Sequence, residues 1–270
     1  SDEELAAGWR ISCQVLVQQD MTLELPDGTK DVRMFSAKVV ELEMMSHDVR
    51  RARLELITPD TIRYLPGAFI LLDIPPAPGA PRGASRSYSI ATPPSSTRAF
   101  EINVKLVPGG IGSGFVHNTL KVGDTVTFTG PYSGYADSAE NNEIICVAGG
   151  SGMSPVLSIL RHLKEIQSSR PVLYFFGVKT SADLLYLDEL HALEKTLPSF
   201  RFVPVLEVPT PNERPHFETG LVTQAITDFV TDASGASAYL CGSPGMLGAC
   251  CSLLTKLGIS DKKIFFDKFG

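Results

Sequence analysis

Four short segments carry residue types that could do chemistry, and the first is a run of glycines. Gly149, Gly150 and Gly152 follow a compact apolar stretch and come just before Met153 and a helix-like pattern. Glycines at such a turn let backbone N–H groups approach a pyrophosphate, and the start of the next helix favours its negative charge. Glycines also serve simply to turn the chain tightly, so this segment alone leaves both interpretations open.

The other three segments lie before and after this turn. In the first of them, Arg86 presents a fork of donors suited to a pyrophosphate, although a surface salt bridge would use it equally well. In the second, a cysteine lies beside glycine, proline and methionine, and a buried structural cysteine would be chemically inert. The segments are Arg86-Ser87-Tyr88-Ser89, Cys241-Gly242-Ser243-Pro244-Gly245-Met246 and Asp267-Lys268-Phe269.

Length and composition bound the class of protein that holds these segments. The 270 residues favour two domains, and 43% hydrophobic with 20% charged residues is typical of a soluble globular chain. Residues 1–32 carry a net charge of −5 out of −6, so the rest is nearly neutral and predicts no nucleic-acid or basic membrane surface. No run of about 18 apolar residues predicts a membrane helix. Five cysteines without a paired framework favour a reducing compartment, and we expect the cytoplasm.

Short strands predominate in the first half of the chain. Apolar alternation or short apolar runs occur at residues 35–42, 51–57, 68–74, 100–107 and 125–129, with glycine and proline clusters between them. This spacing predicts a closed β-barrel or a sandwich over residues 33–138, with a short helix at 113–120.

Strands and helices alternate in the second half. We expect strands at 144–148, 172–178, 200–206, 237–241 and 264–266, and helices at 154–166, 182–197, 221–229 and 245–257. This alternation predicts a doubly wound parallel sheet covered on both faces, over residues 139–270. A polar, acidic stretch at 138–142 sets the expected domain boundary.

Taken in order, the motifs R-x-Y-S, G-G-x-G-x-x-P and C-G-x-P-x-M resemble the ferredoxin–NADP reductase family. Each motif is common alone, and the resemblance rests on the three together, covering roughly residues 32–270. It implies a two-domain protein, in which a flavin-binding antiparallel β-barrel precedes a nicotinamide-dinucleotide-binding α/β domain.

The resemblance implies an FAD site on the barrel. Arg86 would bind the FAD pyrophosphate, Tyr88 would lie on the isoalloxazine ring, and Ser89 would hydrogen-bond near flavin N5. Tyr88 could instead be a core aromatic and Ser89 an ordinary strand serine. The further implied FAD contacts are Ser87, Asn103, Val104, Lys105, Gly110, Ile111, Gly112, Ser113, Ser151 and Phe269.

For the second domain the resemblance implies an NADH site and a group near the hydride path. Phe269 would cover the flavin until nicotinamide displaces it, and Asp267 would assist proton or nicotinamide positioning. The implied catalytic residues are Ser89, Cys241, Asp267 and Phe269. The implied NADH contacts are Gly149, Gly150, Ser151, Gly152, Met153, Lys179, Glu207, Cys241, Gly242, Pro244 and Met246.

The choice between NADH and NADPH is a question of charge. The extra phosphate of NADPH needs a cationic pocket after the second and third strands of the sheet. Lys179 follows the second strand, but Glu207 follows the third, where an acid repels a phosphate and accepts hydrogen bonds from ribose hydroxyls. We therefore expect NADH.

Residues 6–14 resemble the end of a plant-type [2Fe–2S] ferredoxin domain, in which Cys13 would be the last cluster ligand. The other three ligands would lie upstream. We therefore expect residues 1–32 to be the remnant and linker of a ferredoxin domain, in a longer protein that carries the cluster.

That domain order resembles the reductase components of soluble di-iron oxygenases. We expect hydride transfer from NADH to FAD, then single electrons to a [2Fe–2S] domain or protein and on to a terminal oxygenase. The alternatives are the peripheral flavin subunit of a sodium-pumping NADH:quinone reductase, a non-catalytic electron-transfer subunit, and a regulatory module that has lost its flavin.

Overall fold

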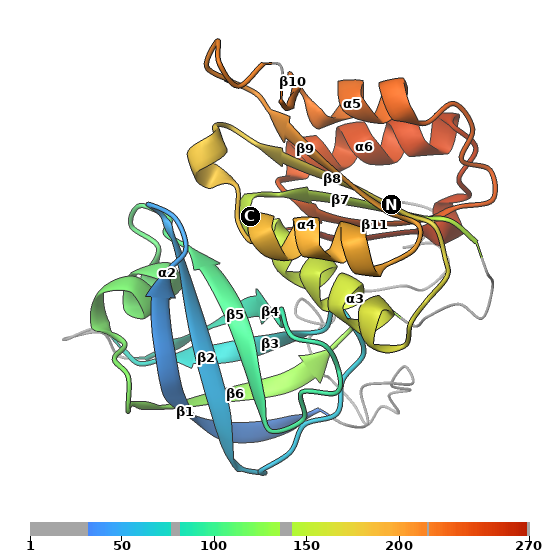
Figure 1. The fold of residues 1–270 in the computed structure, drawn as a ribbon. Helices are drawn as coiled ribbons and strands as arrows, with labels where there is room; N and C mark the ends of the chain where they lie inside the picture. The colour runs from blue at the N-terminus through green and yellow to red at the C-terminus, as the bar shows by residue number, and fades with distance from the viewer. Residues whose placement is uncertain (1–31, 77–81, 136–141, 215, 269–270) are drawn as a thin grey trace, which may run out of the picture.

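The structure is a computed structural model that describes residues 32–76, 82–135, 142–214 and 216–268, which form two six-stranded sheets (Figure 1). The expected domains 33–138 and 139–270 each hold one sheet, although the expected boundary at 138–142 falls largely outside the described residues. The ferredoxin remnant with Cys13, and Phe269, also lie outside them.

The first sheet is antiparallel throughout and curls into a barrel. Its strand order is β4-β3-β6-β1-β2-β5, and an isolated bridge between Ile90 and Ile102 joins the two edges. Inside, the Phe128 ring stacks on Phe35 and meets Phe100 edge-on. The strands are β1 Arg33–Met44, β2 Val49–Thr58, β3 Phe69–Ile74, β4 Ala84–Ser89, β5 Ala99–Lys105 and β6 Thr125–Tyr132.

Two features of the barrel differ from the sequence prediction. Strand β4 was not expected as a strand, because its residues 85–87 face solvent and it lacks an alternating apolar pattern. The helix expected at residues 113–120 begins earlier and has two parts, α2 Ile111–Gly114 and a π-helical turn Phe115–Thr119.

The second sheet is parallel and doubly wound, as predicted. Its order is β10-β9-β8-β7-β11-β12, so the strand order reverses between β7 and β11. The strands are β7 Ile144–Gly149, β8 Val172–Val178, β9 Phe200–Leu206, β10 Glu218–Thr219, β11 Ser237–Gly242 and β12 Ile264–Lys268.

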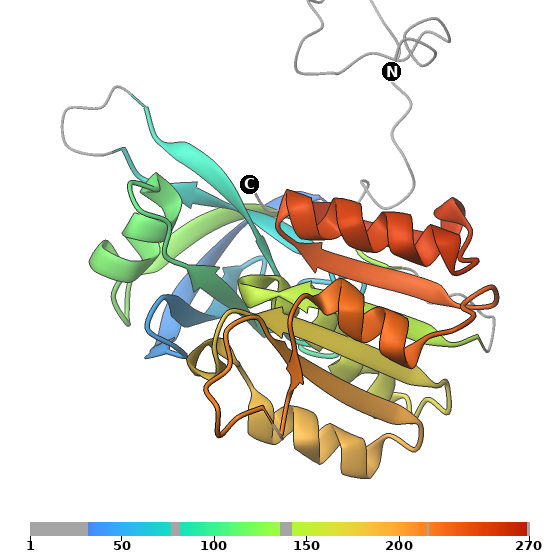
Figure 2. The ribbon, with the colours of Figure 1, turned by 90° about the horizontal axis from the view of Figure 1, so that it is seen from above.

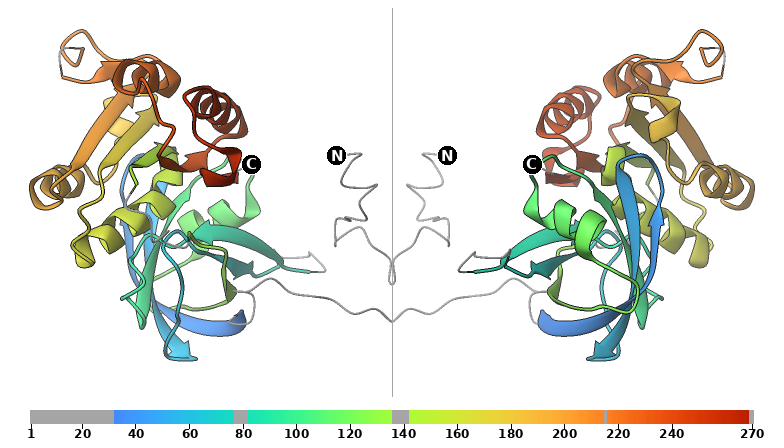
Figure 3. Two further views of the ribbon diagram at one scale, coloured as in Figure 1. Left: turned by 90° about the vertical axis from the view of Figure 1, so that its right-hand side faces the viewer. Right: turned by 90° about the vertical axis from the view of Figure 1, so that its left-hand side faces the viewer.

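Helices cover both faces of this sheet (Figures 2 and 3). Helices α3 Met153–Glu165 and α4 Leu187–Thr196 lie on the side of the barrel, and α5 Val222–Phe229 and α6 Pro244–Lys256 lie on the other. The helix expected at 182–197 begins only at Leu187, because residues 181–183 form a 3-10 turn and Tyr186 adopts a left-handed conformation. Within the described ranges, no helix is long and apolar enough to cross a membrane.

Helix α3 is the element that joins the two domains. The Ser158 hydroxyl donates to the Thr92 carbonyl at 2.6 Å and accepts from the Gly67 N–H at 3.3 Å. Both partners are barrel loop residues, and Ser158 is fully buried. These two hydrogen bonds fix the position of the helix on the barrel.

One turn further along α3, Arg161 binds the barrel through charge. Its guanidinium donates to the Ala91 carbonyl at 3.1 Å and to the Glu101 carboxylate at 3.2 Å, and it also forms a two-bond pair with Glu189 of α4. Glu101, in β5, is buried and also accepts from Arg53. Removing Arg161 would leave Glu101 with only a half-exposed partner.

We expect Arg161→Met to lower the free energy of unfolding by roughly 3 kcal/mol, since it leaves a buried carboxylate poorly compensated. Arg98→Met is the matched control, because Arg98 is 75% exposed and its pair with Asp60 is a surface one expected to be worth less than about 1 kcal/mol. Chemical denaturation of both variants measures the difference. Equal losses would contradict a special role for the Arg161 contacts.

Candidate functional site

A cavity of about 590 Å³ lies at the carboxyl end of the parallel sheet. It opens beyond the ends of β7 and β11, between which the strand order reverses. Open α/β sheets bind their ligands at such a point. Backbone segments rich in glycine make up much of its wall, and a barrel side chain, that of Lys105, also reaches it. The cavity therefore offers N–H groups and close backbone approach, as a dinucleotide requires.

The glycine turn after β7 forms one wall. Gly149, Gly150 and Ser151 line the cavity, and Gly150 has a positive φ of 54°. Gly152 packs behind them, where an added Cβ would lie 2.3 Å from the Cys241 carbonyl oxygen. The turn can approach β11 this closely only because position 152 has no side chain.

The segment after β11 forms the opposite wall. Ser243 caps helix α6 by accepting from the Met246 N–H, and Pro244 takes the first helical position, where its missing N–H costs nothing. Met246 packs against the backbone at Gly149 and Gly242. The wall residues are Gly242, Ser243, Gly245, Met246 and Ala249.

Four predicted NADH contacts lie beside the cavity rather than on its wall, and one of them is Pro244 of α6. Met153 and Cys241 are fully buried, and Gly152 packs behind the turn. Burial raises the pKa of the Cys241 thiol, with Asp267 adding to the effect, so the thiol is protonated at neutral pH. The Cys241 carbonyl oxygen thus packs against Gly152, and the side chain of Cys241 is an uncharged thiol.

Charged residues lie at the rim of the cavity. Lys179 and Glu207 follow β8 and β9, and both are exposed on its lining. Asp183 also lines it, and its carboxylate accepts from the N–H and hydroxyl of Thr180. The sequence analysis missed Asp183.

Other lining residues were missed as well, and most of them lie at the carboxyl end of a parallel strand or just after it. Chain order placed four strand ends at the site, whereas the short strand β10 was not expected. The missed residues of this kind are Gly177, Val178, Gly220, Leu221, Val222 and Thr223.

The barrel brings the predicted flavin residues to one place. An added Cβ at Gly112 would lie 2.7 Å from both Arg86 Cγ and the Tyr88 hydroxyl, so α2 rests directly on β4. Ser113 fixes the loop before it by accepting from the Val107 N–H at 3.1 Å. Arg86 and Ser87 remain exposed, Tyr88 is half-buried and Ser89 is buried, which leaves donors on the surface beside an aromatic ring. Gly110 and Ile111 complete this loop.

Strand β5 serves both domains. Val104 is buried in the barrel, and its carbonyl lies 2.8 Å from His117 Nε2. The Asn103 side chain points the other way, to Ser154 of α3. Lys105 pairs with Asp48 at 3.2 Å and extends to the glycine turn. The predicted backbone contacts of these residues to FAD stay a prediction.

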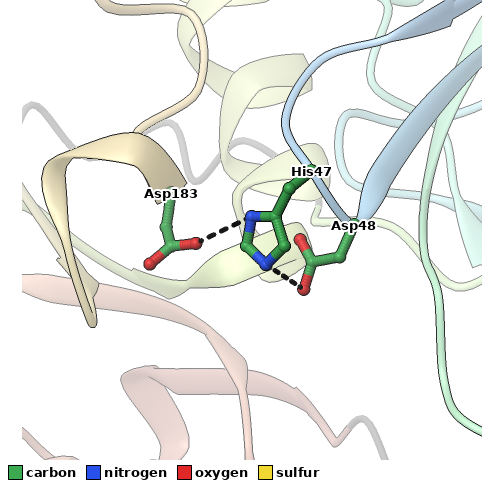
Figure 4. A group of neighbouring side chains, drawn as sticks. All are labelled: His47, Asp48 and Asp183. Atoms are coloured by element: carbon green, nitrogen blue, oxygen red, sulfur yellow. Dashed lines mark ion pairs between the residues drawn. The ribbon is translucent and has the colours of Figure 1, made fainter.

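One ion pair, between His47 and Asp183, crosses between the domains (Figure 4). His47 lies in the β1–β2 turn, and its ring nitrogens are 3.7 Å from the Asp48 carboxylate and 3.6 Å from that of Asp183. The His47 side chain is 69% exposed, so these pairs contribute little to stability. They do bring Asp48, an acidic residue of the barrel, close to Asp183 at the cavity rim.

Asp267 lies at the barrel-facing edge of the parallel sheet. It is paired with Cys241 across β11 and β12, and its carboxylate accepts from the Tyr135 hydroxyl at 3.4 Å. Burial raises the pKa of Asp267, and the Tyr135 bond opposes that rise. Tyr135 itself packs on Tyr239 and Phe265.

Two known domain families match the two sheets. Residues 36–136 match an oxidoreductase FAD-binding domain, and residues 146–252 match an oxidoreductase NAD-binding domain.

The chain is similar to several known proteins over most of its length. The reductase component of propane 2-monooxygenase from Mycolicibacterium smegmatis is 31% identical, with 100% of this chain and 79% of the relative covered. A ferredoxin–NAD(P)⁺ reductase component of naphthalene 1,2-dioxygenase/salicylate 5-hydroxylase systems from Ralstonia is 33% identical over 96% of this chain and 77% of the relative. The Amycolatopsis cytochrome P450 reductase GcoB is 31% identical, with a TM-score of 0.80 over 88% of this chain and 70% of that one.

The chain therefore belongs to the ferredoxin reductase family of FAD- and NAD-binding oxidoreductases. Within that family it is similar to the reductase components of monooxygenase and dioxygenase systems. It is an NAD(P)H oxidoreductase that transfers electrons through FAD, as the sequence analysis predicted.

We expect Gly152→Ala to weaken nucleotide binding by roughly tenfold, which corresponds to about 1.4 kcal/mol. The added methyl group would collide with the Cys241 carbonyl and push the glycine turn out of place. Gly248→Ala, in α6 with nothing within 4 Å, is the control and should stabilise the helix slightly. Calorimetric titration with NAD⁺ compares the two, and equal affinities would contradict the tight approach.

A raised Asp267 pKa makes stability depend on pH in a defined direction. The folded state holds the proton more tightly than the unfolded state, so this group stabilises the fold below its ordinary pKa, near 3.8. That contribution is lost as the pH rises through the folded pKa.

We therefore expect Asp267→Asn, which cannot ionise but can still accept from Tyr135, to raise the melting temperature at neutral pH. The gain should shrink as the pH falls toward 3.8. Thermal unfolding over a pH series measures it, with Asp228→Asn at an exposed position of α5 as the control. A gain that is constant with pH would contradict the argument.

Proposed function

We propose that this protein is an FAD-dependent NADH oxidoreductase that supplies an oxygenase with single electrons through a [2Fe–2S] centre. One observation supports this most directly: the barrel residue Lys105 reaches the glycine-lined cavity of the other domain. A nucleotide in that cavity would therefore lie next to the barrel that carries the flavin motif. The relatives named above support the oxygenase as the destination of the electrons.

The described residues fit FAD. Arg86 and Ser87 are exposed donors at the edge of the barrel, next to the half-buried ring of Tyr88. Gly112 leaves no room for a side chain beside the Tyr88 hydroxyl, and the loop next to it carries further N–H groups. Arg86 would bind the pyrophosphate, Tyr88 would lie on the ring system and Ser89 would donate a hydrogen bond near its reactive nitrogen. When bound, FAD accepts two electrons with a hydride and releases them singly.

The chain's own residues align the nucleotide. The pyrophosphate of NADH would lie on the N–H groups of the turn formed by Gly149, Gly150 and Ser151, with Lys105 adding a positive charge. Gly242 and Met246 would face it from the other wall. Alignment of two reactants and exclusion of water are the protein's contribution to such a transfer.

Asp267 and Phe269 would act at the edge nearest the barrel. Burial raises the pKa of Asp267 above that of an exposed aspartate, so its carboxyl group could hold a proton beside the site. Phe269 would cover the flavin until the nicotinamide displaces it, and Cys241 would shape the path by packing. Cys13, in the front segment, would ligate the [2Fe–2S] cluster only within a longer protein.

NADH is the proposed nucleotide because acidic groups surround the cavity rim. Glu207 and Asp183 line it, and the only lining cations among the described residues are Lys105 and Lys179. Lys105 lies beside the glycine turn and would meet the pyrophosphate, which leaves Lys179 as the lining cation for an extra phosphate. An extra phosphate would meet repulsion at Glu207, whereas ribose hydroxyls would donate to its carboxylate.

We expect the wild-type protein to react faster with NADH than with NADPH, and Glu207→Gln to shift that ratio toward NADPH by roughly tenfold, equal to about 1.4 kcal/mol of removed repulsion. Anaerobic rapid mixing with each nucleotide measures flavin reduction. Glu218→Gln, in neighbouring β10 and off the cavity wall, is the matched control. A wild-type preference for NADPH would contradict the proposed nucleotide, and an unshifted ratio would contradict the role of Glu207.

A further inference from the structure

A chain of hydrogen bonds joins the two domains beneath the glycine turn. The Tyr186 hydroxyl donates to Asn103 Oδ1 at 2.9 Å, and Asn103 Nδ2 donates to Ser154 Oγ at 3.0 Å. The Ser154 hydroxyl in turn donates to the Ser151 carbonyl at 3.0 Å. Because Ser154 gives its only proton to Ser151, it must accept from Asn103, which fixes the orientation of the amide.

The chain starts in a strained residue. Tyr186 has φ 58° and ψ 28°, a left-handed conformation that is rare for a bulky side chain. Such backbone costs about 1–3 kcal/mol and persists where surrounding contacts demand it. Here the conformation interrupts the expected helix one residue before α4 and lets the hydroxyl reach β5 of the barrel.

The ring of Tyr186 is also held in place. The Arg161 guanidinium lies 5.5 Å from the ring centroid, and Glu189 fixes that guanidinium with two bonds. Burial, with the nearby Glu101 carboxylate, raises the pKa of Tyr186 to about 12. The hydroxyl therefore keeps its proton at neutral pH and remains a donor to Asn103.

We propose that Tyr186 is a positioning residue for electron transfer between nucleotide and flavin. It acts through Asn103 and Ser154 on Ser151, which lines the nucleotide cavity, while Asn103 belongs to the flavin-binding barrel. The bond chain sets the separation of the two bound groups, on which the rate of transfer depends. This inference rests on the proposed function, in which both groups bind as described.

Tyr186→Phe tests the inference, since it removes the hydroxyl and keeps the ring on Arg161. The matched control is Tyr174→Phe, because the buried Tyr174 hydroxyl, in β8, has no hydrogen-bond partner among the described residues. Both proteins are loaded with FAD and mixed anaerobically with whichever of NADH and NADPH reduces the wild type faster. We expect the limiting reduction rate of Tyr186→Phe to fall about threefold to tenfold, the equivalent of one lost hydrogen bond.

A second readout does not depend on activity. Hydrogen exchange of the peptide containing Gly149–Met153, measured without nucleotide, should speed up several-fold in Tyr186→Phe, because Asn103 loses the bond that holds its amide in place beneath Ser154. Tyr174→Phe should exchange like the wild type, and FAD content should be equal in all three proteins.

Wild-type rate and wild-type exchange in Tyr186→Phe would overturn the inference. A slower rate that comes with loss of FAD, or that Tyr174→Phe shares, would also overturn it, because the effect would then be one of packing. Failure of the proposed function is a separate result: reduction by NADPH alone would refute the proposed nucleotide and leave the comparison of the variants unaffected.

Discussion

The packing of helix α3 against the barrel is the contact on which the rest of the site depends. Arg161 and Ser158 fix the helix against barrel loops and the buried Glu101, so the start of the same helix cannot move freely relative to the barrel. That start carries the glycine turn. The fixed backbone would therefore set the distance between a nucleotide bound at this turn and the flavin motif.

A second constraint comes from how closely the backbone segments approach. The glycine turn meets β11 at the Cys241 carbonyl, and α2 meets β4 at Arg86 and Tyr88. Each approach requires a glycine, so both sites are built from backbone N–H groups with few side chains between them and a ligand. In the proposed function, charge then selects among ligands, and Glu207 and Asp183 would supply it at the cavity rim.

Much of this could be predicted from the sequence. Strands β8 and β9 lie where the apolar runs place them, because buried parallel strands are nearly continuous apolar segments. Strand β4 could not be predicted in the same way, since half of its residues face solvent. Tyr186 looked like part of a helix, but its backbone is left-handed and its hydroxyl contacts Asn103 of the barrel, a contact between domains that local spacing does not reveal. Asp183 was missed because its place at the cavity depends on how strands sit side by side, which spacing along the chain does not reveal.

In the proposed function, one cavity brings NADH to a flavin held on the barrel. Anaerobic titration of the FAD-loaded protein with NADH, followed by the flavin absorbance band, tests it most directly. We predict that near-stoichiometric NADH bleaches the band completely. A protein that retains FAD yet keeps its full absorbance after excess NADH would contradict the account.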